Sequence, residues 1–177
     1  MHSLPGLIID PADASNVATV EALLDAAAVW QQSRGSHQWR PGQFGEEVRR
    51  TIANGDLYVA RQGGVVIGCF MLDDGSPRMT QWLVEHDRTP TRGVLGRLAV
   101  TREMSGQGLG LEILNAASTI AAQGGIAFLR LECPAENERL RRYYVEAGFS
   151  HCGDNDTPGP NGEHWVTSMF ERPTGVG

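Results

Sequence analysis

Three glycines that follow an apolar run constrain this chain more than any other feature. The run ends at Val100, and Gly106, Gly108 and Gly110 precede the apolar, alanine-rich stretch 111–122. Glycine has no Cβ, so the backbone can turn tightly there and direct several N–H groups to one point. A helix that begins at such a turn adds unpaired N–H groups and the positive end of its dipole. The segment therefore predicts a strand, an anion-binding loop and a helix, with phosphate or pyrophosphate as the ligand.

The loop matches neither of two well-known phosphate-binding motifs. A P-loop needs Lys followed by Ser or Thr after its last glycine, whereas Leu111 and Glu112 follow Gly110 here. The dinucleotide-binding fingerprint needs a glycine where Leu111 stands. Glycines also precede helices for purely conformational reasons, so the loop alone leaves a structural role open.

A second strand and helix follow downstream. The apolar stretch 126–133 predicts a mostly buried strand, which Pro134 closes. A helix is expected from about 135 to 147, with Gly148 as the residue after its end. Phe149 is placed to make the hydrophobic contact that accompanies such a helix ending.

Together, these two segments resemble the GNAT superfamily, the acetyl-coenzyme A dependent N-acyltransferases. The sequence L-A-V, followed by S-G-Q-G-L-G and a long helix, is similar to the family's pyrophosphate-binding motif, and N-E-R-L-R-R-Y-Y-V-E-A-G-F is similar to its closing strand-helix motif. The match is close over 94–149, and before it only the order of elements agrees. Ser105 is a departure, because the family usually has Arg or Gln there to contact the pyrophosphate.

The resemblance implies that acetyl-CoA, or a related acyl-CoA, is a co-substrate. The strand that carries L-A-V would pair its backbone with the pantetheine amides, like an added strand. The loop at 105–110, called the glycine loop below, would hold the pyrophosphate. The expected donor-binding residues are Leu98, Ala99, Val100, Ser105, Gly106, Gln107, Gly108, Leu109, Gly110 and Asn137.

Tyr144 is the expected catalytic acid. It matches the family's acid position, four residues before Gly148, and shares a helix face with Asn137 and Leu140. A phenol with a pKa of about 10 stays protonated at neutral pH and can donate to a leaving thiolate whose conjugate acid has a pKa of about 8.5. Two structural alternatives stay open: a half-buried tyrosine with a satisfied hydroxyl, and Asn137 as a helix cap.

The implied reaction moves an acetyl or other short acyl group to a primary amine by direct attack in a ternary complex. We expect the amine to belong to a small molecule, bound where this family builds its acceptor wall, between the first two helices. Trp30 and Trp39 are candidate walls, and Arg97 is a candidate partner for an acceptor carboxylate. The sequence leaves four candidates for the general base: Glu85, His86, Asp87 and Glu132.

The remaining patterns complete an α+β order of elements. Strands are expected at 7–10, 57–61, 65–72, 94–100, 126–133, 149–153 and 164–170, with helices from Asp13 or Ser15 to 32, at 44–53, after Gly110 and at 135–147. By resemblance, this is the GNAT fold: a mixed central sheet of about six to seven strands flanked by about four helices. In that fold, the strand carrying L-A-V splays from the strand carrying L-R-L-E-C.

Composition narrows the class of protein. A chain of 177 residues that is 41% hydrophobic predicts a single domain, 1–177. Its net charge of −6 disfavours nonspecific binding to nucleic acid or an anionic membrane. Without a signal-like N-terminus or a membrane-length apolar run, we expect a cytoplasmic monomer or homodimer. Cys69, Cys133 and Cys152 lack metal-ligand spacing, so no metal site is expected.

Two alternatives differ in the ligand. A nucleotide-binding βαβ module would explain Glu132, at the end of its second strand, as a ribose ligand, but it leaves Y-Y-V-E-A-G-F unexplained. The other alternative keeps the acyltransferase fold and takes the acyl group from the phosphopantetheine arm of an acyl carrier protein. It is favoured by Ser105, which weakens the expected hold on pyrophosphate.

Overall fold

The computed structural model describes residues 4–36, 38–73, 92–158 and 164–175. The chain divides into two compact units that interleave along the sequence. Unit 1 comprises Met1–Leu72 and Arg97–Ala116, and unit 2 comprises Asp73–Gly96 and Ala117–Gly177. The expectation of a single domain over 1–177 stays a prediction.

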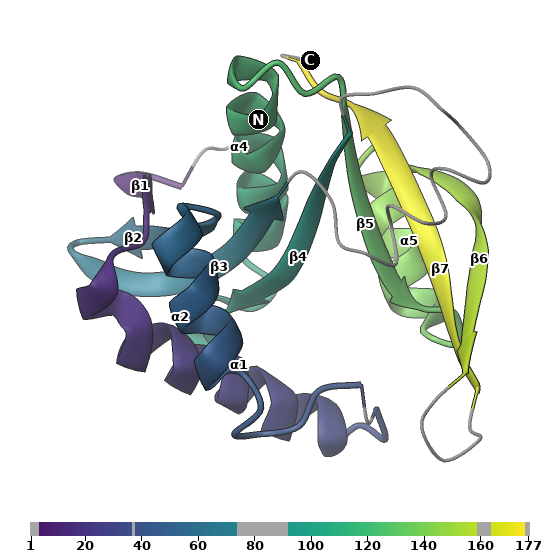
Figure 1. Ribbon diagram of the computed structural model, residues 1–177, viewed down its shortest axis with the longest axis horizontal. Coiled ribbons are helices and arrows are strands. Elements are labelled where there is room, and N and C mark those ends of the chain that lie inside the picture. Colours follow the sequence, from purple (N-terminus) through teal and green to yellow (C-terminus); the bar gives the residue numbers. More distant parts are fainter. Residues whose placement is uncertain (1–3, 37, 74–91, 159–163, 176–177) are drawn as a thin grey trace. The chain divides into compact units, whose positions relative to one another are not determined.

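Two elements contribute residues to both units. They are strand β4 (Arg92–Val100) and helix α4 (Leu109–Gln123) (Figure 1). Neither unit is therefore a continuous piece of sequence.

Unit 1 holds the N-terminal elements. They are β1 (Leu7–Pro11), η1 (Ala14–Asn16), α1 (Val17–Gln32), α2 (Gly45–Asn54), β2 (Leu57–Gln62), β3 (Val65–Asp73, up to Leu72) and, after the end of β4, η2 (Arg102–Met104) and the start of α4. Asp13 caps the first helical turn, as expected: its carboxylate accepts from the Ser15 N–H at 2.8 Å, and the Asn16 side chain accepts from the Asp13 N–H at 3.0 Å. Gly63 and Gly64 join β2 to β3 in a tight hairpin turn, with φ of 57° and 82°.

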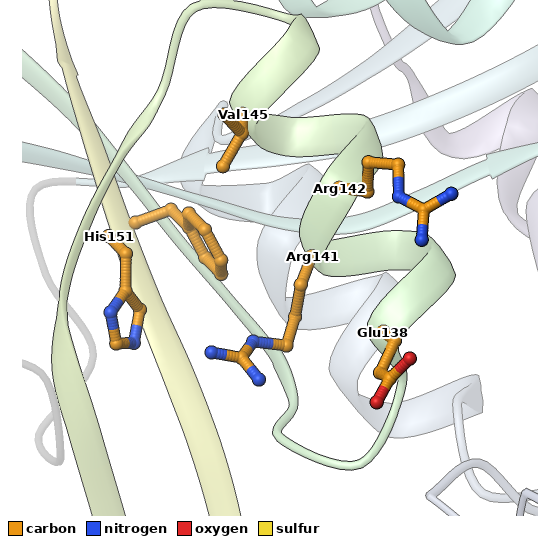
Figure 2. A pocket seen from close by; sticks show the side chains of 6 residues that line it. Glu138, Arg141, Arg142, Val145 and His151 are labelled. Carbon is orange, nitrogen blue, oxygen red and sulfur yellow. The ribbon is translucent and has the colours of Figure 1, made fainter.

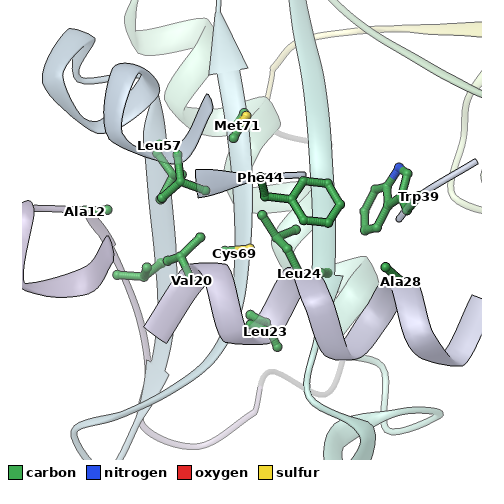
Figure 3. Packing of buried hydrophobic residues seen from close by; sticks show 13 residues of the cluster. Ala12, Val20, Leu23, Leu24, Ala28, Trp39, Phe44, Leu57, Cys69 and Met71 are labelled. Atoms are coloured by element: carbon green, nitrogen blue, oxygen red, sulfur yellow. The ribbon is translucent and has the colours of Figure 1, made fainter. Parts of the chain in front are cut away.

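The core of unit 1 lies where α1 and α2 pack on β2 and β3 (Figure 3). Leu24 from α1, Phe44 before α2, Leu57 from β2 and Cys69 from β3 are almost fully buried in it. Trp39 joins the cluster with its ring at 5.5 Å from the Phe44 ring, in an edge-on arrangement. Burial of these apolar side chains is the main favourable term in folding the unit.

Gly68 faces the other way from Cys69, because neighbouring residues of a strand point to opposite faces. A Cβ on Gly68 would lie 2.9 Å from Ile113 Cδ1 and 3.1 Å from the carbonyl oxygen of Ala99. Helix α4 and strand β4 therefore approach β3 more closely here than any side chain on Gly68 would allow. The sheet of unit 1 thus has α1 and α2 on one face and the start of α4 on the other.

Unit 2 is built on the C-terminal strands. Its elements are the start of β4, the end of α4, β5 (Phe128–Pro134), α5 (Glu138–Glu146), β6 (Ser150–Pro158) and β7 (His164–Pro173). Strand β7 pairs antiparallel with β5 on one side and β6 on the other. Helix α5 packs on these strands, with Tyr144 against Phe170 at a ring distance of 5.7 Å.

The strands are ordered β1-β2-β3-β4-β5-β7-β6. Strands β4 and β5 run parallel, and the other described pairings are antiparallel, so the sheet is mixed, as predicted. The parallel register joins Arg92, Gly93 and Val94 to residues 128–130, a short pairing that agrees with the expected splay. None of the helices in the described part of the chain is long and apolar enough to cross a membrane.

Several boundaries differ from the sequence-based expectation. Strand β6 continues to Pro158 instead of ending at Gly153, because its polar residues find partners on β7: Asp154 accepts from the Ser168 hydroxyl at 2.7 Å. The register shifts between His151 and Gly153, leaving Cys152 as the extra residue of a bulge. Helix α5 begins at Glu138 instead of 135.

Candidate active site

The glycine loop follows β4 and η2 and leads directly into α4. Gly106 and Gly108 have φ of 80° and 86°, the left-handed conformation that glycine adopts without a Cβ penalty. Open space surrounds the position of a Cβ at both residues, so it is the backbone conformation, not crowding, that requires glycine. The expected tight turn before the helix is confirmed.

Backbone N–H groups of this loop are available to a ligand. Ser105 N–H donates to the Arg102 carbonyl at 3.1 Å, and Gln107 N–H donates to the Met104 carbonyl at 3.3 Å. Within the described part of the chain, the N–H groups of Gly106, Gly108, Leu109 and Gly110 have no acceptor. Four unpaired donors at the start of a fifteen-residue helix form the kind of site that binds phosphate.

The side chains of the loop add less than its backbone. The Gln107 amide folds back and donates to the Glu103 carbonyl oxygen, so it reinforces the turn. Ser105 is exposed and carries no charge. The loop is therefore suited to an anion through N–H groups and the helix dipole, without the guanidinium that an Arg at 105 would add.

Residues Leu98, Ala99 and Val100 form the end of β4, immediately before the loop. Ala99 is buried in the core of unit 1, whereas Leu98 and Val100 are partly exposed. Thr101 N–H donates to the Ile67 carbonyl at 2.9 Å, which fixes the end of β4 to β3. Their role in donor binding stays a prediction.

Tyr144 lies in unit 2, in the last turn of α5. The helix ends in a left-handed Gly148 with φ of 84°; the Gly148 N–H donates to the Val145 carbonyl and the Phe149 N–H to the Tyr144 carbonyl, each at 3.0 Å. This is the Schellman ending that the sequence predicted, and Phe149 makes the accompanying contact with the Tyr144 ring. The arrangement fixes the position of the Tyr144 ring.

The Tyr144 ring is enclosed by other aromatic rings. It is 7% exposed and contacts Tyr143, Phe149 and Phe170 at centroid distances of 5.6, 6.0 and 5.7 Å. Burial raises the pKa of the Tyr144 phenol above its ordinary value, because the phenolate would lose its hydration. The phenol therefore keeps its proton throughout the neutral range, as a proton donor must.

Asn137 caps α5, which is the structural alternative that the sequence left open. Its Oδ1 accepts from the Leu140 N–H at 3.0 Å. Among the described residues, the Asn137 Nδ2 group has no acceptor, so it is available to a ligand. Asn137 and Tyr144 lie in the same unit, on one helix.

The predicted acceptor residues lie in unit 1, in different surroundings. Trp39 is buried in the core. Trp30, at the end of α1, is partly exposed, with the Arg102 guanidinium 4.1 Å and the Arg34 guanidinium 5.5 Å from the centre of its ring. Of the two tryptophans, Trp30 is the one that a ligand can reach.

Arg97 is paired within the protein. Its Nε and Nη2 donate to the two carboxylate oxygens of Glu47, at 2.9 and 3.2 Å. No sequence pattern indicates Glu47 as a partner of Arg97, because the two residues are 50 positions apart. This contact does not test the predicted pairing of Arg97 with an acceptor carboxylate. An acceptor carboxylate would compete with Glu47 for the guanidinium.

Of the candidate bases, Glu132 is described, and Glu85, His86 and Asp87 lie outside the described residues. Glu132 is half-buried on β5, and its Oε2 accepts from the Thr167 hydroxyl at 3.2 Å. No group of three His, Cys, Asp or Glu side chains in the described ranges could hold a metal ion. Burial raises the pKa of the Cys69 and Cys133 thiols to about 12, so neither is a nucleophile at neutral pH.

A groove of about 270 Å³ lies on unit 2 between α5 and the strands β6 and β7 (Figure 2). Arg141, Val145 and His151 line it, and Phe170 lies between this groove and Tyr144. The His151 Nε2 is engaged with Asp154 at 2.9 Å. None of the predicted site residues lines this groove.

Comparison with known proteins identifies the family. The model of the acetyltransferase (GNAT) family matches residues 22–149, more than half of the chain. The chain belongs to the GNAT family. Among known GNAT proteins, it is 30% identical over 156 residues to YesJ of Bacillus subtilis strain 168, an uncharacterized N-acetyltransferase, with 84% of each chain covered.

Solved GNAT structures share the fold at lower identity. An acetyltransferase of the family from Streptococcus agalactiae superimposes with a TM-score of 0.77 at 19% identity, over 98% of this chain and 99% of that chain. YncA from Salmonella typhimurium, solved with its cofactor acetyl-CoA, has a TM-score of 0.68 at 15% identity, over 97% and 96% of the two chains. The chain is thus a GNAT N-acetyltransferase in family and fold, and the nucleotide-binding βαβ alternative is set aside.

Proposed function

We propose that this GNAT enzyme transfers an acetyl or other short acyl group from a coenzyme A thioester to the primary amine of a small molecule. Four unpaired N–H groups support this proposal: two belong to the left-handed Gly106 and Gly108, and two to Leu109 and Gly110 at the start of α4. A pyrophosphate with adjacent negative charges suits this loop, because N–H groups and the helix dipole attract anions without a basic side chain.

The amine attacks the thioester carbonyl carbon directly, in a ternary complex. A C–N bond forms, the C–S bond breaks, and the amine loses a proton to a base or to water. Tyr144 donates its hydroxyl proton to the departing sulfur and regains a proton from the surrounding water. The backbone of residues 98–100 holds the pantetheine arm and can offer an N–H to the carbonyl oxygen as negative charge develops on it.

Acceptor binding is assigned to Trp30 rather than to the buried Trp39. An indole flanked by the Arg34 and Arg102 guanidiniums presents both an apolar surface and positive charge. Such a surface suits an amine whose other end carries a carboxylate or a similar anion. Binding of an acceptor carboxylate by Arg97 stays a prediction, because that carboxylate would compete with Glu47 for the guanidinium.

Ligand-dependent melting tests the donor. Acetyl-CoA at a concentration of about 100 Kd should stabilise the native state by about 2.7 kcal/mol, which raises Tm, whereas NAD should leave Tm unchanged. Release of free coenzyme A across a panel of small amines then identifies the acceptor. Activity confined to protein N-termini would contradict the assignment of a small-molecule acceptor.

Ser105 supports a second donor, the phosphopantetheine arm of an acyl carrier protein. Calorimetric titration of the wild type and of Ser105→Arg with coenzyme A separates the two donors. Measurable binding by the wild type, strengthened by Arg, supports coenzyme A. Binding that is undetectable in the wild type and restored only by Arg would move the assignment to the carrier protein.

A further inference from the structure

Arg97 has an unusual backbone conformation for a residue inside a strand. Its φ is 50°, and it is the one residue other than glycine with a positive φ among the described ranges. A left-handed residue brings its Cβ close to the backbone, so an arginine stays in this conformation only where its surroundings hold it there. It also interrupts the regular alternation of β4, as the left-handed residue of a β-bulge does.

Three contacts in unit 1 hold the Arg97 side chain. The guanidinium donates to both carboxylate oxygens of Glu47, on α2, a two-bond arrangement that fixes its plane as well as its position. It also lies 5.6 Å from the ring centres of both Trp39 and Phe44, which belong to the buried core. The Arg97 and Glu47 side chains are 31% and 28% exposed, so water screens the pair only in part.

The backbone that follows Arg97 is the segment to which donor binding is assigned. The Arg97 carbonyl oxygen accepts from the Cys69 thiol at 3.7 Å, and the Ala99 carbonyl oxygen lies against Gly68. A return of Arg97 to an extended conformation would rotate the peptide groups that follow it. The directions of the N–H and carbonyl groups at 98–100 therefore depend on the conformation of Arg97.

We propose that Glu47 and Arg97 are positioning residues, forming a clamp that holds β4 in its left-handed turn and so orients the backbone of residues 98–100. The inference rests on the proposed function in one respect, the assignment of that backbone to the acyl donor. Through Glu47, helix α2 would then help to orient the backbone that binds the acyl donor. Arg97 would act on that backbone and not on the acceptor. The clamp acts through the backbone and touches no reacting atom.

Hydrogen exchange of the amides at 98–100, measured by NMR without ligand, tests the clamp independently of activity. Glu47→Gln removes the charge of the acceptor, and Arg97→Ala removes the guanidinium while keeping the Cβ that strains the turn. In both variants we expect exchange at these amides to accelerate about fivefold or more. Arg97→Gly removes the clamp but accepts the left-handed conformation freely, so its exchange should lie closer to the wild type than that of Arg97→Ala.

Arg49→Gln is the matched control. It breaks the exposed pair that Arg49 of α2 makes with Glu21 at 2.9 Å, and it should leave exchange at 98–100 unchanged. Equal exchange in Glu47→Gln, Arg49→Gln and the wild type would overturn the clamp. Faster exchange in Arg97→Gly than in Arg97→Ala would also overturn the clamp. It would show that the Arg97 side chain does not act by maintaining the left-handed backbone conformation.

Steady-state kinetics distinguish the clamp from the alternative role of Arg97, which is to bind the acceptor. If the clamp is right, Arg97→Ala lowers kcat and kcat/KM for several acceptors alike, by about fivefold or more, and Arg97→Gly recovers part of the loss. If Arg97 instead binds the acceptor, both variants raise the acceptor KM equally with kcat unchanged, which overturns the proposal. Failure of the enzyme to use acetyl-CoA would refute the proposed function, while the exchange result would still decide whether the clamp exists.

Discussion

Phe149 donates its backbone N–H to the carbonyl oxygen of Tyr144 at 3.0 Å, and the rings of the same two residues are in contact at 6.0 Å. The hydrogen bond that ends α5 thus joins the two residues whose rings pack together. The Tyr144 ring is therefore fixed by the helix ending as well as by its aromatic neighbours. A change at its hydroxyl can be made without moving the ring.

Replacing Tyr144 with Phe should reduce catalysis with little effect on stability. Loss of the proton donor should lower kcat and kcat/KM together by roughly 10²-fold, while the Kd for acetyl-CoA stays near the wild-type value. Steady-state kinetics and calorimetry measure the two quantities. Tyr143→Phe is the control and should keep most activity. A wild-type rate of the Tyr144→Phe enzyme from pH 6 to 10 would show that Tyr144 is not the proton donor and that water protonates the leaving thiolate.

Substitution of Gly106 by Ala should weaken donor binding. The left-handed conformation costs a residue with a Cβ roughly 1–2 kcal/mol, so either the protein loses stability or the loop changes shape and its N–H groups no longer converge. Gly125→Ala is the control, since Gly125 has φ of 77° and equally open space. Urea unfolding should report a similar loss in both variants, whereas only Gly106→Ala should raise the Kd for coenzyme A. An unchanged Kd would remove the loop from the donor site.

Gly68→Ala should destabilise the protein by roughly 1–3 kcal/mol, because its Cβ would press on Ile113 and on the backbone of Ala99. The measurement is the midpoint of urea unfolding. Gly96→Ala is the matched control: a Cβ there meets nothing within 4 Å, and its φ is not positive. Adding Ile113→Val should recover only part of the loss, since the backbone contact remains. Full recovery would show that the approach of β4 to β3 does not require glycine.

Thiol reactivity should distinguish the three cysteines. Cys69 and Cys133 are each 1% exposed, and burial raises the pKa of both thiols to about 12, so neither should react with a thiol reagent at pH 8 while the protein is folded. Cys152, in the β6 bulge, is partly exposed and should react. Titration with Ellman's reagent should give one fast thiol, which Cys152→Ser abolishes. A second fast thiol in the native protein would contradict the burial of the other two.

Asp154 should contribute to stability in a pH-dependent way. Hydrogen bonds from Ser168 and then from His151 lower the pKa of its carboxyl, so its contribution is fully present above the unfolded-state pKa of about 3.9 and is lost as pH falls through the folded-state value. Urea unfolding of the wild type and Asp154→Asn should therefore differ at pH 6 and converge near pH 2. A constant difference across that range would show that the carboxylate charge plays no part.

The glycine loop and the end of α5 could be predicted because local sequence determines them. Gly106, Gly108 and Gly148 are each required by a left-handed backbone, and the bond from Phe149 to Tyr144 spans only five residues. Such features depend on near neighbours in the chain. They are therefore visible in the sequence before any tertiary contact is known.

The features that could not be predicted depend on distant partners. The polar start of the expected loop at 154–163 is strand up to Pro158 because Asp154 meets Ser168, and nothing in the segment itself identifies that partner. The sequence predicts an acceptor carboxylate as the partner of Arg97, and it does not indicate Glu47, which is 50 residues away. Asn137 could be assigned to the cap or to the ligand from sequence, and the structure shows only that its oxygen serves the cap.

The interleaving of the two units has a consequence for synthesis of the chain on the ribosome. Residues 1–72 form most of unit 1, but Gly68 of β3 packs against Ala99, Val100 and Ile113, which are made later. A nascent chain that ends before Ile113 thus exposes one side of a nearly complete sheet. Translation arrest within 73–112 should accordingly give a chain that resists proteases poorly and recruits chaperones, whereas arrest after α4 should not.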